Sequence, residues 1–249
     1  AYIEHLEPIG STQLKSMYDI TYSPATIRGY FKKLGEEGYL AQEHISSGRT
    51  PTTEALKQYW QSKLNLKLKG LNLRALEYFA SEIGLSVFIK KEKSDVLKNI
   101  LNVEKRYMIL EFSSFAISVK YSDALYRFLN DMIGLDLKDI TRISKDVGAY
   151  EVYESINQTL QNSDFQIFNY KEFLNLALNY DFDEYTINSF LKGQILDELT
   201  EGLYFDKFLP SNYIGICNYC KINNEDVKML VIGELPKDYE YFYEKITTF

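Results

Sequence analysis

Residues 23–34 read SPATIRGYFKKL, and this stretch decides how the N-terminal part of the chain folds. Ser23 can accept a hydrogen bond from the first turn of a helix. Pro24 suits the first helical position, because the N–H that proline lacks has no partner there. On a helical wheel centred on Ile27, three apolar residues fall within about 60° of that direction, namely Tyr30, Phe31 and Leu34. The spacing therefore predicts a capped, amphipathic helix whose core face carries these four side chains.

The opposite face of this helix combines small and basic residues. Two small residues in its middle would let base edges approach the backbone closely, and long cations at its margins would reach phosphates or a guanine. The free N–H groups of the first turn could also hold a phosphate oxygen. A solvated helix face would carry similar charges, so the order of the surrounding elements has to decide. We predict a DNA-recognition helix with the candidate contacts Ser23, Ala25, Thr26, Arg28, Gly29, Lys32 and Lys33.

The segments on either side of this helix complete a familiar order. A short helix is expected from an N-cap at Ser11 to about Tyr18, and a strand over 39–45 is followed by turn residues and a return at 50–51. Another helix, capped by Thr52 or Thr53, would run to Leu64. Helix, turn, helix, hairpin and helix within about 65 residues is winged-helix order.

The tip of the predicted hairpin offers small hydroxyls and a cation around Gly48. Such a wing could lie along a groove of DNA and pair with phosphates, although an ordinary solvated turn has the same composition. The candidate contacts here are Ser46, Ser47 and Arg49.

The rest of the chain alternates between strand and helix patterns. Helical periodicity dominates 124–160 and 173–203, while strand patterns lie on both sides of the first helical block. The pattern predicts an α+β fold in which one α/β domain carries a mainly helical insertion. The expected strands are 85–89, 107–112, 115–119, 213–217 and 229–232, and a last helix is expected at 239–246.

Charge is distributed unevenly along the 249 residues. The whole chain has a formal charge of −7, but residues 1–70 hold nine basic against seven acidic side chains, so a polyanion should meet this part. No apolar run approaches the roughly 18 residues of a membrane span, and no secretory leader is visible, so a cytoplasmic location is expected. The chain begins at Ala1 without methionine, and Tyr2–Leu6 has the pattern of a helix tail, so we expect residues before Ala1.

Four segments together resemble the HrcA family of heat-inducible repressors over nearly all of residues 2–59. Weaker matches follow at 129–137 and at 232–239. One departure is Gly29, where the family usually has asparagine, so an adenine or phosphate contact would be lost there. The four segments are EPIGS at 7–11, SPATIR at 23–28, LGEEGYL at 34–40 and HISSGRTPT at 44–52.

The resemblance implies a transcription repressor of chaperone genes that binds an inverted-repeat operator, CIRCE, as a homodimer. It also implies that the GroEL chaperonin modulates activity. Three parts are expected: a winged helix-turn-helix at 1–66, a GAF-like domain at 67–122 and 165–249, and an inserted dimerising domain at 123–164. An alternative is a winged-helix regulator that responds to a small ligand or to redox state through the GAF-like domain.

Other candidate sites are weaker. Cys217 and Cys220 have the spacing of a redox pair or half a zinc site, but His5 and His44 are the only histidines and lie far away in the sequence. The acidic residues in NYDFDE at 179–184 lack the glycine and distal glutamate of a calcium loop, so a solvated turn is expected. We therefore predict no enzyme, no metal and no cofactor.

Overall fold

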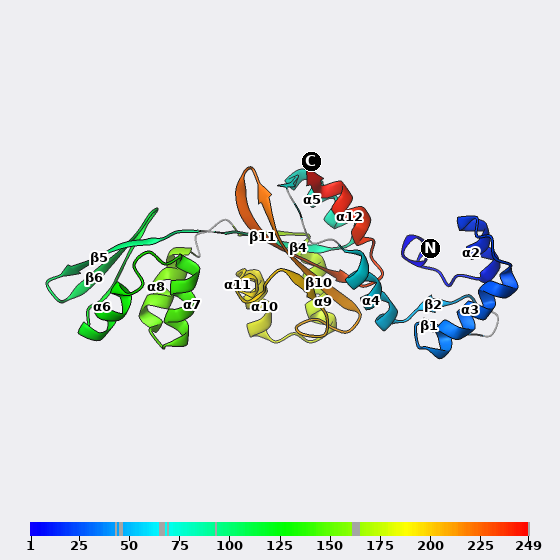
Figure 1. Cartoon of the computed structure of the whole chain (residues 1–249), viewed down its shortest axis with the longest axis horizontal. Helices are drawn as coiled ribbons and strands as arrows, with labels where there is room; N and C mark the ends of the chain where they lie inside the picture. The colour runs from blue at the N-terminus through cyan, green and yellow to red at the C-terminus, as the bar shows by residue number, and fades with distance from the viewer. Residues whose placement is uncertain are drawn as a thin grey trace. The chain divides into compact units, whose positions relative to one another are not determined.

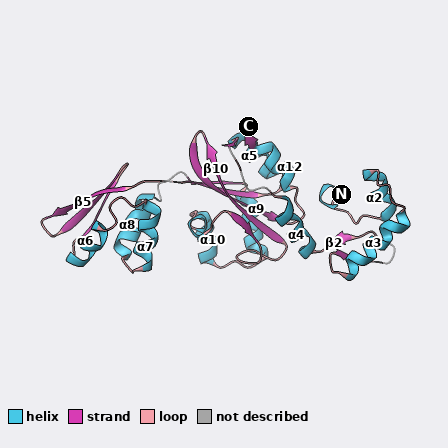
Figure 2. Cartoon of the chain, in the orientation of Figure 1, coloured by secondary structure: helices cyan, strands magenta, loops and turns pink. Residues whose placement is uncertain are grey.

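The structure is a computed structural model that describes residues 1–42, 44, 47–64, 68, 70–92, 94–160 and 165–248, without the side chains of 160 and 248. The chain divides into two compact units (Figure 1). The first combines residues 1–89 with 166–249, and the second is Lys90–Phe165. Both contain helices and strands, so the predicted mixed α+β class is confirmed (Figure 2).

The N-terminal elements follow the predicted order. Helix α2 ends at Tyr18 as predicted, but its N-cap is Gly10 rather than Ser11. Among the described residues, the first hairpin strand comprises Leu40 and Ala41, which pair with Pro51 and Thr50 respectively, and Glu43 and Ile45 of the predicted strand lie outside the described residues. The elements are α1 (Tyr2–His5), α2 (Ser11–Tyr18), α3 (Pro24–Glu36), β1 (Leu40–Ala41), β2 (Thr50–Pro51) and α4 (Thr53–Lys63).

A central sheet organises the rest of the first unit. Among the described residues, seven strands form it in the order β12-β3-β10-β11-β4-β8, with β9 beside β10. The long antiparallel pair β10 and β11 supplies its middle, from Tyr213 opposite Glu234 to Ile222 opposite Glu225. The strands are β3 (Gly70–Leu71), β4 (Ser86–Lys91), β8 (Phe165–Phe168), β9 (Gly202–Tyr204), β10 (Tyr213–Ile222), β11 (Glu225–Glu234) and β12 (Thr247–Thr248).

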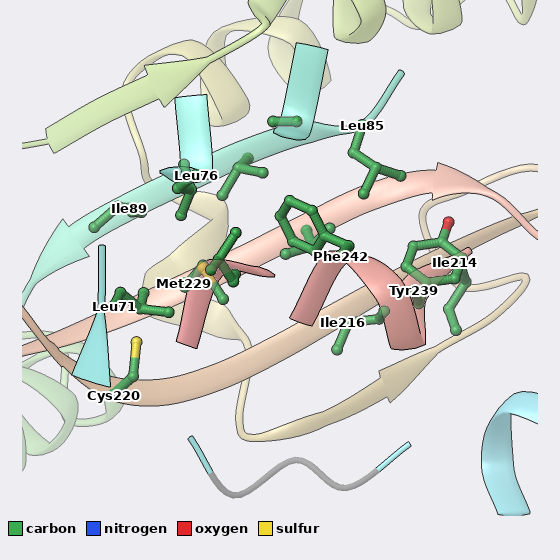
Figure 3. Packing of buried hydrophobic residues seen from close by; sticks show 14 of the residues in the cluster. Leu71, Leu76, Leu85, Ile89, Ile214, Ile216, Cys220, Met229, Tyr239 and Phe242 are labelled. Atoms are coloured by element: carbon green, nitrogen blue, oxygen red, sulfur yellow. The ribbon is translucent and has the colours of Figure 1, made fainter. Parts of the chain in front are cut away.

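Helices cover both faces of this sheet. On one face, α5 (Leu73–Ile83) and α12 (Tyr239–Ile246) bury Leu76, Tyr239 and Phe242 against Ile214, Ile216 and Met229 of the sheet (Figure 3). On the other, Phe88 of β4 packs against Phe173 and Phe190, with ring centroids 5.4 and 5.5 Å away. The helices of that second face are α9 (Tyr170–Asn179), α10 (Glu184–Leu191) and α11 (Ile195–Glu198).

Helix α4 contributes to this central core. Its buried residues Leu56 and Trp60 belong to the same cluster as the sheet and α12, and Tyr59 and Leu64 pack against that cluster. The helical periodicity of the sequence identified the apolar stripe of α4 correctly, but it could not show which hydrophobic core the stripe packs against.

The second unit has its own core. Within the described part of this unit, a three-stranded antiparallel sheet, in the order β5-β6-β7, packs on three helices. The predicted start of the insertion at residue 123 is therefore wrong, because the strands from 97 to 120 share a hydrophobic cluster with the helices after 123. The elements are β5 (Leu97–Val103), β6 (Tyr107–Phe112), β7 (Ala116–Lys120), α6 (Asp123–Asn130), α7 (Leu137–Asp146) and α8 (Tyr150–Leu160).

A buried carboxylate organises the turn between β6 and β7. Asp95 accepts hydrogen bonds from the backbone N–H groups of Ser113 and Ser114, at 2.7 and 2.9 Å, and from the Ser114 hydroxyl at 2.6 Å. Burial raises the pKa of Asp95, but the hydrogen bonds from Ser114 and Ser113 outweigh it and hold the pKa at about 2.

Within the described parts of the chain, none of the helices is long and apolar enough to cross a membrane.

Candidate nucleic-acid interface

The start of α3 is built as the sequence predicts. The Ser23 hydroxyl oxygen accepts a hydrogen bond from the backbone N–H of Thr26 at 3.1 Å, and the two hydroxyls lie 2.9 Å apart. Pro24 is the first helical residue. The cap fixes the direction in which α3 leaves the preceding loop. It also engages the hydroxyl of Ser23, which is one of the predicted DNA contacts.

The outer face of α3 is open to solvent. Ile27 is only 5% exposed and points inward. A methyl group built on Gly29 would meet nothing within 4 Å, so packing does not require a glycine there and the space lies on the outside. The predicted contacts on this face are all exposed: Ser23, Ala25, Thr26, Arg28, Gly29, Lys32 and Lys33.

The cations on this face differ in their partners. Lys32 lies 3.8 Å from Glu36 and Lys33 lies 3.9 Å from Glu37, both as exposed pairs one helical turn apart. Such pairs contribute little to stability and exchange readily for a phosphate partner. Within the part of the chain that the structure describes, Arg28 has no acidic partner. Its charge is thus the one on this face that is free of internal pairing.

The hairpin is fixed to the segment that precedes α2. Ile9 and Arg49 exchange two backbone hydrogen bonds of 2.9 Å. A methyl group on Gly48 would lie 2.5 Å from the backbone of Pro8, so only glycine allows this close approach. The backbone of Arg49 is therefore held in place, while its side chain is half-buried.

Ser47 serves the turn itself. Its hydroxyl donates to the carbonyl of His44 at 2.7 Å and accepts from the backbone N–H of His44 at 3.0 Å. These bonds shape the tip, so contact of Ser47 with DNA stays a prediction. The predicted contact Ser46 lies outside the described residues.

The predicted core face of α3 was wrong in one respect. Tyr30 is 53% exposed and Leu34 is 37% exposed, while Phe31 is half-buried. Tyr30 lies at the margin of the apolar stripe, where a phenol can keep its hydroxyl in water. Its ring packs edge-on against the exposed Tyr22 at 6.0 Å, so two aromatic side chains stand beside the start of α3. Sequence reasoning missed both, since an aromatic residue at helical spacing more often indicates core.

The cysteine pair does not form a site. Cys217 and Cys220 are three residues apart on β10, so they point to opposite faces of the sheet, and Cys220 alone belongs to the cluster in Figure 3. Burial raises the pKa of Cys217 to about 11 and that of Cys220 to about 12, which leaves both as thiols. This geometry opposes the redox alternative, whereas the small-ligand alternative stays a prediction.

The acidic turn before α10 has a structural role. Asp183 accepts a hydrogen bond from the backbone N–H of Thr186 at 2.7 Å and so caps that helix. Among the described residues, three or more potential metal ligands do not come together anywhere.

Comparison with known proteins fits this arrangement. A heat-inducible transcription repressor HrcA of Helicobacter pylori strain J99 is 30% identical over 99% of this chain and 90% of its own length. Another, from Chlorobium phaeobacteroides, is 27% identical over 72% of this chain and 49% of its own length. A solved structure of a hypothetical protein has 18% identity and a TM-score of 0.47, covering 98% of this chain and 91% of that one, a similarity too low to assign a fold.

These matches place the chain among transcription repressors, a class without enzymatic activity. A model of the HrcA C-terminal domain also matches residues 60–249. The chain belongs to the HrcA family of heat-inducible transcription repressors.

Proposed function

We propose that the chain represses chaperone genes by binding the inverted-repeat operator CIRCE as a homodimer in the cytoplasm. The N-terminal elements act as a winged helix-turn-helix, and α3 enters the major groove. The observation that carries the proposal is the open outer face of α3, where the unpaired Arg28 lies beside the space at Gly29. The remaining parts act as a GAF-like domain and an inserted dimerising domain.

Binding to DNA tests this directly. Fluorescence anisotropy would compare a CIRCE duplex with a scrambled duplex of equal length, each at two salt concentrations. We expect preference for the repeat and an affinity that falls steeply as salt rises, because phosphate contacts release counterions. Equal affinity for both duplexes, with and without GroEL, would contradict the proposal, while a preference that appears only with GroEL would support the chaperonin as activator.

Single arginines then locate the interface. Arg28→Ala should lower operator affinity about tenfold, the usual consequence of losing one guanine or phosphate contact. Arg49→Ala should lower affinity for operator and scrambled duplex alike, because the wing would contact the backbone. The matched control is Arg74→Ala, an exposed arginine on α5 of the central domain, which should bind as the parent does.

The second unit offers a surface for the dimer. Leu101, Val103 and Tyr107 are 42%, 40% and 55% exposed. The register places Leu101 opposite Ile109 and Val103 opposite Tyr107, on the face turned away from the core of that unit. An apolar sheet face of this kind favours a partner surface over water.

Sedimentation velocity tests the dimer. Leu101→Lys should shift the chain toward monomer at micromolar concentration, whereas Val147→Lys, which places the same charge at another exposed apolar position of the unit, should not. A Leu101→Lys chain that sediments as the parent dimer would exclude this face.

A further inference from the structure

Helix α4 is fixed to the central domain by its C-terminal half. Trp60 is fully buried, and its indole N–H donates to the carbonyl oxygen of Leu235, the residue after β11, over 2.7 Å. Its ring stands edge-on to that of Tyr239 at 5.1 Å. Tyr239 in turn donates to the carbonyl of Glu234 at 2.9 Å, so Trp60 is seated on a connection that is itself held in place.

Polar contacts at two other points hold the same helix. The Tyr59 hydroxyl donates to Glu240 at 2.9 Å, and the Lys57 ammonium lies 2.5 Å from Asp206. Each contact has a solvent-exposed acidic partner and adds little stability. Lys57 and Tyr59 project about 200° apart around α4, so the two contacts together limit its rotation about its own axis.

The N-terminal end of α4 is fixed to the recognition helix by one residue. The Thr52 hydroxyl donates to the carbonyl of Gly38, just after α3, at 2.8 Å, and accepts from the N–H of Ala55 in α4 at 3.3 Å. The backbone N–H of Thr52 donates to Tyr39 at 3.0 Å. Thr52 thus joins the end of α3, the start of the hairpin and the cap of α4.

Helix α1 provides another tie. Ile3 packs against the cluster of the central sheet, and Glu4 accepts a hydrogen bond from the hydroxyl of Tyr18 at the end of α2. Both ends of the N-terminal segment are therefore connected to the same core.

We propose that α4 is a rigid arm that carries α3 on the central domain, with Thr52 and Trp60 as positioning residues for operator recognition. The inference rests on the proposed function. When α3 has one orientation in each copy, a dimer accepts one separation of the two operator half-sites. Loosening the contacts of Thr52 or of Trp60 weakens binding to an operator with the correct half-site separation. It also reduces the strain of binding to an operator with a wrong separation, so the protein discriminates less between the two operators.

The test compares three variants of the full chain. Thr52→Val keeps the side-chain shape and removes the two hydrogen bonds of the hydroxyl. Thr52→Ser keeps the hydroxyl and both of those hydrogen bonds. Trp60→Phe keeps an aromatic ring without the N–H donor. Affinities are measured for inverted repeats whose spacer is native or changed by one or two base pairs, and for a single half-site. Thermal unfolding verifies that each variant is folded.

We expect Thr52→Val and Trp60→Phe to lower the discrimination between native and altered spacers about fivefold, the factor of one lost hydrogen bond. Thr52→Ser should retain the parent's discrimination, and affinity for the single half-site should stay unchanged in all three. Equal loss of affinity for every duplex would indicate a merely structural role and overturn the proposal, as would unchanged discrimination.

A distance measurement tests the rigidity of α4 independently of operator binding. Spin labels at Ala25→Cys on α3 and Ser81→Cys on α5 lie at exposed positions, and the native thiols are buried. Pulsed electron paramagnetic resonance should give a narrow distance distribution that broadens in Thr52→Val. A broad distribution in the parent, or no broadening, overturns the arm. Broadening in a chain that does not prefer CIRCE to scrambled DNA supports the arm and overturns its operator role together with the proposed function.

Discussion

Among the described residues before Thr53, the buried side chains are Ile9, Ser11 and Ile27, whereas the central sheet buries side chains from α4, α5, α12 and its long strands in one cluster. The N-terminal segment nevertheless carries the most specific sequence motif of the chain. Hydrophobic stabilisation scales with the apolar area that is buried, so the central cluster contributes more to the stability of the fold than the N-terminal segment does. In the proposed function, the segment contributes the exposed side chains that contact DNA, and the central domain contributes the stability that holds the segment.

The strongest way to break this division is Trp60→Ala. Removing a fully buried tryptophan leaves a cavity and should cost about 3–5 kcal/mol of unfolding free energy. Urea denaturation followed by circular dichroism measures the loss, with Gln58→Ala on the exposed side of α4 as control. A loss below about 1 kcal/mol would show that α4 is not part of the central core.

Ile27→Asp should affect the N-terminal segment alone. An unpaired carboxylate in place of a buried isoleucine should cost about 3 kcal/mol or more within that segment. We expect rapid amide hydrogen exchange in α2 and α3 with unchanged protection in β10 and β11, measured by exchange and mass spectrometry. Simultaneous loss of protection in the central strands would mean that the two regions unfold as one.

The second unit extends the comparison through pH. The pKa of Asp95 is lower in the folded chain than in the unfolded one, so its contribution to stability is present above pH 4 and is lost as pH falls toward 2. We expect a loss of about 1 kcal/mol by pH 3 and roughly 2 kcal/mol by pH 2 from this group. Urea denaturation of the parent and of Asp95→Asn at several pH values isolates this contribution as the difference between their free energies of unfolding. A difference that stays constant with pH would contradict the lowered pKa of Asp95.

The smallest expected effect concerns the thiols. Because Cys217 and Cys220 face opposite sides of β10, operator affinity should be the same in dithiothreitol and in the thiol oxidant diamide. A reversible change of affinity would restore the redox alternative.

Local signals predicted much of this fold. The Ser23 cap, the strand at Tyr107–Phe112 and the helix at Tyr239–Ile246 follow from capping chemistry and periodicity, which depend on neighbouring residues. The strand β5 was missed because Asn99, Asn102 and the bulge near Leu97 obscure its alternation. The insertion boundary was missed because the local patterns of β6 and β7 identify them as strands without showing which sheet they join.

The candidate site shows the same limit. The exposure of Arg28 and Gly29 follows from the wheel, since Gly29 lies opposite Ile27 and Arg28 lies at the margin of that opposite face. The exposure of Tyr30 and the docking of Trp60 depend on which surfaces meet in three dimensions, and one sequence does not contain that information.

The chain contains a single tryptophan, and it is the residue at the joint between α4 and the central domain. Its emission spectrum therefore reports one event, the seating of that helix, without any label. Buried indole emits at shorter wavelength than indole in water, so a red shift on warming that precedes the loss of circular dichroism would mark the temperature at which α4 leaves its seat. In a family whose relatives are described as heat-inducible, the protein thus carries an intrinsic optical probe at the position where a thermal response would change the presentation of α3.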